Sequence, residues 1–170
     1  MPRIVIAFGS NRGDREGFLG DAIARLRHEM TIVSVSPVYE TDPMYVQDQP
    51  PFLNGVLVAE TDRGPLETLA VLKKVEREVG RTPAERYGPR EIDLDLIAFG
   101  PVAYRFLDKG RAKLQVPHPR TPERRFVLAP LADLLPDLVL PGLGKVQTLL
   151  NACPNPADSV RLYQHAVVPL

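Results

Sequence analysis

The chain has 170 residues, 44% of them hydrophobic, with 21 basic and 21 acidic side chains. That length is typical of one domain with its own core, and the zero formal charge argues against a general attraction to nucleic acid or to an anionic membrane. The single cysteine, Cys153, excludes an intramolecular disulfide, and no apolar run is long enough to span a membrane, so we expect a cytoplasmic protein.

The first hundred residues alternate between strand-like and helix-like patterns. β-Branched runs that stop at glycine or proline predict strands, and apolar residues at spacings of three and four predict helices. Asp14 is expected to cap the first helix and Gly80 to end the second. The predicted elements are a strand over 3–8, a helix over 15–30, a strand over 31–39 with Pro37 suited to an edge or a bend, a loop over 42–52, a strand over 53–60, a helix over 65–79, a polar loop over 81–89 and a strand over 92–99.

This order of elements is the split βαββαβ unit of a ferredoxin-like plait. We therefore expect an α+β fold with an antiparallel sheet and two helices on one face. After Gly100 the patterns are weaker and predict a C-terminal hairpin over 102–107 and 114–116, a helix over 123–135 and a short helix over 146–151. We expect one domain over 1–170, with no clear structure for the 152–170 tail.

Asp93 and Asp95 carry the strongest chemical signal. Residues two apart in a strand share a face, with Cα atoms about 6.5–7 Å apart, so both carboxylates should point the same way while Ile92, Leu94, Leu96 and Ala98 enter the core. Two such carboxylates repel each other unless a cation lies between them. Hard oxygen ligands at this spacing suit Mg²⁺ that is also bound to substrate phosphates. The alternative is a solvated polar face with each aspartate paired to an arginine.

Basic residues on both sides of this pair favour a phosphate ligand. Arg86 and Arg90 flank a Gly-Pro turn just before it, and a guanidinium fork binds phosphate oxygens in pairs. Further on, Arg124 and Arg125 begin a predicted helix, where positive charge is unfavourable for the helix dipole, so at least one of them is expected to bind a ligand. His118 is either a phosphate contact or a structural surface histidine.

At this point the sequence resembles the 6-hydroxymethyl-7,8-dihydropterin pyrophosphokinases of folate synthesis. The resemblance extends over about residues 4–145 in the family's order. It is carried by Gly9-Ser10-Asn11, Ser36–Pro43, Asp48–Asn54, Arg86–Asp95, Val116–Pro119 and the group Arg124, Phe126, Val127 and Leu128.

The resemblance implies transfer of pyrophosphate from ATP to the pterin hydroxymethyl oxygen, with release of AMP. It also implies two Mg²⁺ ions on Asp93 and Asp95, and mobile loops over 42–52 and 81–90. The site residues that it implies are Arg81 and Arg90 in catalysis, Glu76, Tyr87, Arg90, His118 and Arg124 at ATP, and Thr41, Pro43, Phe52, Asn54 and Phe126 at the pterin. The expected partners are these two small molecules, with no nucleic acid and no membrane, and the expected state is a monomer.

The sequence departs from the family pattern at a few points, and two other functions remain open. Tyr87 stands where many members have tryptophan, Pro119 where some have tyrosine, and an arginine expected shortly after Arg81 has no clear match. A phosphate-ester hydrolase would use the same carboxylates to activate water. A regulatory ligand-binding plait would use the fold without catalysis.

Overall fold

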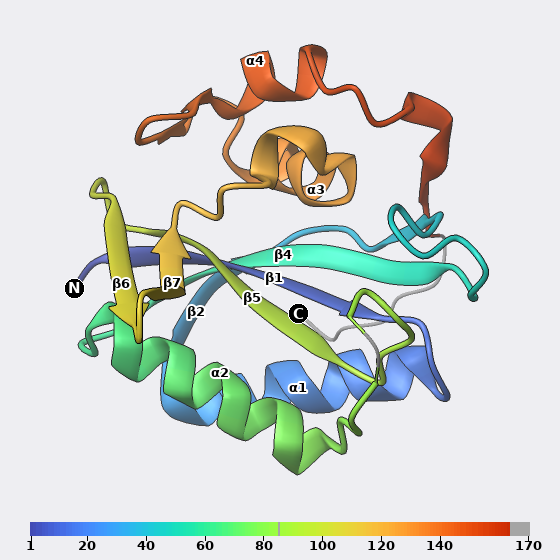
Figure 1. Ribbon diagram of the computed structural model, residues 1–170, viewed down its shortest axis with the longest axis horizontal. Coiled ribbons are helices and arrows are strands. Elements are labelled where there is room, and N and C mark those ends of the chain that lie inside the picture. Colours follow the sequence, from blue (N-terminus) through green and yellow to red (C-terminus); the bar gives the residue numbers. More distant parts are fainter. Residues whose placement is uncertain (85, 164–170) are drawn as a thin grey trace.

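The structure is a computed structural model that describes residues 1–84 and 86–163. A mixed α/β fold in three layers emerges, with a twisted antiparallel sheet between two pairs of helices (Figure 1). Helices α1 (Arg15–Glu29) and α2 (Pro65–Val79) cover one face of the sheet, and α3 (Arg125–Leu134) and α4 (Val146–Asn151) lie over the other.

The main sheet runs in the order β10-β3-β4-β1-β5, and β2 pairs with another part of β4. Its strands are β1 (Arg3–Ser10), β2 (Thr31–Val35), β3 (Tyr39–Thr41), β4 (Phe52–Glu60), β5 (Asp93–Phe99) and β10 (Val160–Leu162). Every pairing in this sheet is antiparallel. The predicted strands over 3–8, 53–60 and 92–99 are confirmed as β1, β4 and β5, and so are the two helices on one face.

The helix ends follow local chemistry. Asp14 accepts a hydrogen bond from the amide of Gly17 at 3.1 Å, the expected N-cap. Gly80 adopts a left-handed conformation with φ of +118° and ends α2, as glycine does without strain. One hydrophobic core lies between α1, α2 and the sheet, and a second lies under α3 and α4.

The predicted single strand over 31–39 is wrong, because it divides into β2 and β3. Pro37 has no amide hydrogen to donate to a sheet ladder. Ser36 fills the gap, since its hydroxyl accepts from the amide of Val56 at 2.9 Å and its own amide donates to the Val56 carbonyl at 2.9 Å. The chain then resumes pairing with β4 as β3.

The expectation that Ala98 faces the same side as Leu94 is also wrong. The pairing of β1 with β5 shifts between Val5 and Ile6, which inserts Ile97 as an extra residue. Ile97 and Ala98 therefore pack under α3, while Leu94 and Leu96 pack against α1 and α2.

The rest of the chain forms shorter elements. The predicted helix over 123–135 is observed as α3, which follows the 3₁₀ turn η1 (Thr121–Glu123). The predicted short helix over 146–151 is confirmed as α4. The expected hairpin consists of β6 (Tyr104–Asp108) and β7 (Arg111–Val116), and β8 (Val139–Leu140) pairs with β9 (Gly144–Lys145).

In the tail, the turn η2 (Ala157–Ser159) leads into strand β10, which pairs with β3. Residues 164–170 of the tail lie outside the described part of the chain. No helix among the described residues is long and apolar enough to cross a membrane.

Candidate functional site

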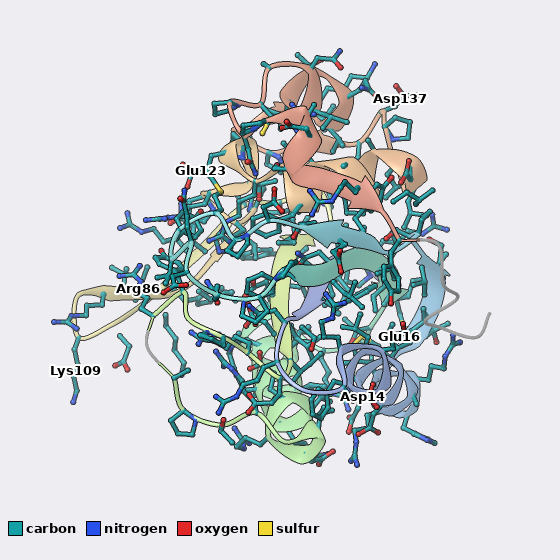
Figure 2. All side chains as sticks on the ribbon, turned by 90° about the vertical axis from the view of Figure 1, so that its right-hand side faces the viewer. Asp14, Glu16, Arg86, Lys109, Glu123 and Asp137 are labelled. Atoms are coloured by element: carbon teal, nitrogen blue, oxygen red, sulfur yellow. The ribbon has the colours of Figure 1, made fainter. Side chains whose placement is uncertain are left out.

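A cavity of about 570 Å³ opens on the face of the sheet that carries α3. Its rim is formed by the loop over 42–52, by residues 81 and 86–90, and by residues 118–120 before η1, on the side of the molecule marked by Arg86 and Glu123 in Figure 2. Eleven of the thirteen site residues implied by the resemblance line it: Thr41, Phe52, Asn54, Arg81, Tyr87, Arg90, Asp93, Asp95, His118, Arg124 and Phe126.

Asp93 and Asp95 both line the cavity, and Leu94 between them is fully buried on the opposite face. The alternation of β5 therefore places the two carboxylates side by side as expected. Burial, and then the charge of Asp93, raise the pKa of Asp95 to about 7. A neighbouring cation would favour ionisation of both groups.

Glu76 lies behind the cavity wall rather than in it. The residue is 1% exposed, and its carboxylate accepts from the backbone amide of Leu94 at 2.9 Å, from Lys73 at 3.1 Å and from Arg81 at 3.2 Å. The second terminal amino group of Arg81 lies 3.8 Å from Asp93. Glu76 thus joins α2 to β5 and aims Arg81 at the carboxylate pair.

Cationic side chains surround the pair. The residues that contribute positive charge to the lining are Lys73, Arg81, Arg86, Arg90, Lys113, Arg120 and Arg124. Of the two arginines expected to include a ligand contact, Arg124 is the candidate, because it lines the cavity. Arg125 instead donates to the carbonyls of Asn155 and Cys153. The cavity therefore has the charge of a polyphosphate site.

His118 is held in its neutral form. Burial and the charges of Arg124 and Arg120 lower its pKa to about 4. Its Nδ1 accepts a hydrogen bond from the backbone amide of Arg120 at 3.2 Å, which requires that nitrogen to be unprotonated. The remaining ring nitrogen is thus the N–H donor of the neutral ring.

Polar and aromatic side chains complete the lining of the cavity. Asn54 is 8% exposed, and its amide nitrogen donates to the Thr41 hydroxyl at 2.6 Å. Phe52 and Phe126 line the same cavity from β4 and α3. Pro43 does not line it, so its expected contact with the pterin stays a prediction without geometric support.

The sheet register places the Asn54 amide near the carboxylate pair. Gly9 of β1 lies opposite Asn54 in β4 on one side and opposite Asp93 in β5 on the other. One row across three strands therefore holds the amide, a glycine without a side chain and a carboxylate.

Sequence reasoning assigned no role to several residues that organise the rim. Asn11 is 2% exposed; its side chain accepts from the amide of Arg90 at 2.8 Å and donates to Gln49 at 3.0 Å, which ties the two loops together. Gln49 in turn donates to the carbonyl of Tyr87 at 2.8 Å. The position of Asn11 between a strand and a helix could have indicated its role. The sequence around Tyr45, Lys73 and Arg120 contains no such signal.

Comparison with known proteins connects this site to one family. The family described as 7,8-dihydro-6-hydroxymethylpterin-pyrophosphokinase matches residues 5–136. A 2-amino-4-hydroxy-6-hydroxymethyldihydropteridine pyrophosphokinase of Pseudomonas aeruginosa is 45% identical over 157 residues, which cover 91% of this chain and 93% of that protein. A protein of the same name from Bacillus subtilis is 44% identical over 131 residues, covering 76% of this chain and 75% of that protein.

Other matches are to longer proteins. The mitochondrial folate synthesis bifunctional protein of Pisum sativum is 47% identical over 133 residues, which cover 78% of this chain but 25% of that protein. A crystal structure of Plasmodium falciparum HPPK-DHPS with pteroate superposes with a TM-score of 0.68 at 16% identity, covering 89% of this chain and 42% of that one. At that identity the likeness shows the fold, and the chain spans less than half of the solved protein.

Proposed function

Because the chain belongs to the 7,8-dihydro-6-hydroxymethylpterin-pyrophosphokinase family, and is thus a pyrophosphokinase of folate biosynthesis, we propose the following reaction. The hydroxymethyl oxygen of 6-hydroxymethyl-7,8-dihydropterin attacks the β-phosphorus of ATP. The bond from that phosphorus to the oxygen that bridges it to the α-phosphate breaks, AMP leaves, and the hydroxyl proton is lost to solvent. The observation that carries the proposal is the Asp93–Asp95 pair, which faces a cavity lined by both cationic and aromatic side chains.

The donor set fits magnesium. Among residues 1–84 and 86–163 no group of three or more carboxylate, histidine or cysteine side chains could hold a metal. Two carboxylates alone suit Mg²⁺, which keeps water and substrate phosphates as its other ligands. Asp93 and Asp95 would hold two such ions, which neutralise phosphate charge when bound.

The cations would bind and orient the triphosphate. Glu76 holds the Arg81 guanidinium beside the aspartates, so this charge is already close to the proposed phosphate site before ATP arrives. Arg90 and Arg124 extend this positive wall, and neutral His118 offers an N–H donor without adding charge. Charge developing toward the departing AMP is then stabilised by groups that need little rearrangement.

The pterin would lie between Phe52 and Phe126, with its edge toward Asn54. A flat heterocycle needs apolar faces and a rim of hydrogen-bonding groups. Since Thr41 already takes a hydrogen from the Asn54 amide nitrogen, the carbonyl oxygen of that side chain remains to accept from the ring. Replacing Asn54 with alanine should weaken pterin binding by about 1–3 kcal/mol and leave ATP binding nearly unchanged.

The proposal also covers the fold class, the location and the oligomeric state of the protein. The strand order β5-β1-β4-β2, with α1 and α2 on one face, supports a ferredoxin-like plait within one domain. We also place the protein in the cytoplasm. We propose that it is a monomer, because the exposed large apolar residues in the described part of the chain come from separate segments. They are Met1, Val33, Leu66, Val102, Leu107, Val139 and Leu162. Light scattering across a concentration series tests the monomer.

One assay separates this reaction from its alternatives. The protein is mixed with ATP and Mg²⁺, with and without hydroxymethyl-dihydropterin, and nucleotides are followed by chromatography. We expect AMP to form only when the pterin is present. AMP or ADP that accumulates equally without the pterin would indicate a hydrolase, and unchanged ATP in both reactions would favour a binding domain without catalysis.

A further inference from the structure

Tyr45 lies at the meeting point of the two rim loops. Its ring stacks on that of Tyr87, with centroids 4.2 Å apart and planes 28° from parallel. The guanidinium carbon of Arg120 lies 5.1 Å from the Tyr45 ring and 5.3 Å from the Tyr87 ring. Stacking and cation–π contacts therefore join the loops over the cavity.

The hydroxyl of Tyr45 makes a second set of contacts. It accepts a hydrogen bond from Nε of Arg124 at 3.0 Å and donates to a carboxylate oxygen of Glu123 at 2.9 Å. Arg124 is only 7% exposed and lines the cavity. The bond uses the guanidinium nitrogen nearest the side-chain stem, so it fixes the plane of the group and does not occupy the terminal amino groups.

We propose that Tyr45 is a positioning residue for the pyrophosphoryl transfer, acting through Arg124. The inference rests on the proposed function, in which Arg124 binds the ATP phosphates. The hydroxyl sets the orientation of the Arg124 guanidinium, and the ring holds the 42–52 loop against Tyr87. A free arginine side chain must lose rotamer freedom when it binds, whereas one already oriented loses less.

Two substitutions separate the hydroxyl from the ring. Tyr45→Phe keeps the stack and removes the hydrogen bonds of the hydroxyl to Arg124, Glu123 and Arg120. Its kcat/KM for ATP should fall on the order of 10-fold, the scale of a hydrogen bond to a charged group, while KM for the pterin stays constant. Tyr45→Leu also removes the stack and should lose on the order of 10-fold more. Tyr104→Phe, in the β6 ring cluster, is the matched control and should behave as the parent.

A double-mutant cycle decides whether Tyr45 acts through Arg124. Once Arg124 is alanine, adding Tyr45→Phe should cause no further loss, because the hydroxyl has no guanidinium left to orient. Losses that multiply would overturn the proposal. Parental kinetics in Tyr45→Phe would overturn it as well.

Amide exchange of the protein alone gives a readout that does not depend on turnover. In residues 86–88, exchange should be faster in Tyr45→Leu than in the parent and unchanged in Tyr45→Phe, because only the leucine variant lacks the stack. Equal exchange in Tyr45→Leu and the parent would contradict the joining role. Absence of pterin-dependent AMP formation in the parent would refute the proposed function instead, so the two failures are distinguishable.

Discussion

Adding one methyl group at Gly9 should disturb the side chain that is proposed to bind the pterin edge. A Cβ built there would lie 2.4 Å from the carbonyl oxygen of the Asn54 side chain, far inside contact distance. The next nearest atoms are Cγ of Asn54 and the carbonyl oxygen of Leu53, each 3.5 Å from that Cβ. Gly9→Ala therefore leaves the backbone room to fold but pushes the Asn54 amide out of place.

The cost follows from the bonds that the displaced amide loses. Asn54 is 8% exposed and donates to Thr41 at 2.6 Å, and in the proposed complex its oxygen faces the pterin edge. A buried polar group that loses its partner costs about 1–3 kcal/mol, which corresponds to roughly 5- to 150-fold in affinity. The assay is calorimetric titration of the variant with pterin after saturation with a non-hydrolysable ATP analogue and Mg²⁺.

Gly64→Ala is the matched control. Gly64 has an extended backbone at the start of α2, and a Cβ there would meet its nearest neighbour, a carboxylate oxygen of Glu67, at 3.7 Å. That variant should bind the pterin as the parent does. If Gly9→Ala also keeps parental pterin affinity, then Asn54 does not read the pterin edge and the pocket lies elsewhere.

Three further outcomes test the other parts of the site. Asp95→Ala should lower the rate at least about 100-fold and keep the melting temperature, and near-normal turnover with unchanged Mg²⁺ dependence would contradict the metal site. Arg90→Lys keeps the charge but loses the fork, so kcat/KM for ATP should still fall; parental kinetics would make Arg90 an ordinary surface charge. The lowered pKa of His118, about 4 against 6.5, means that the unfolded chain binds more protons between these values. Stability should therefore fall with pH below 6.5, by up to roughly 3 kcal/mol at pH 4, and urea midpoints should show a weaker fall in His118→Gln.

The parts of the fold that short-range patterns control were predictable from the sequence. Alternation in β5 placed Asp93 and Asp95 on one face, because the side-chain period of a strand is set by the backbone. Asp14 and Gly80 marked helix ends for reasons that involve only a few neighbouring residues. These features need no knowledge of the rest of the chain.

Features that depend on distant segments were not predictable in this way. The bulge at Ile97 depends on the pairing between β1 and β5. The sequence of β5 alone therefore could not predict that Ala98 lies on the other face. Strand β10 exists because three residues of the tail pair with β3. Likewise, the stack of Tyr45 on Tyr87 joins loops 42 residues apart in sequence, and neither residue carries a motif for it.

The division of the site between sheet and loops has a consequence for catalysis. Asn54, Gly9 and Asp93 lie in one row of three paired strands, and neighbouring strands are about 4.8 Å apart, so the sheet fixes the separation between the pterin-reading amide and the carboxylates. Arg86, Arg90 and Tyr87 instead lie on a loop that polar contacts with Asn11 and Gln49 hold in place.

A rigid row of this kind suits groups whose relative position must not change as the bond forms. Arginines on a loop can instead move toward ATP as it binds, when the loop closes over it. We therefore expect amide exchange in residues 86–90 to slow when an ATP analogue and Mg²⁺ bind, while exchange within β1 stays constant. Equal exchange in residues 86–90 with and without the nucleotide would mean that the loop is already fixed, and that the arginines belong to the rigid part of the site.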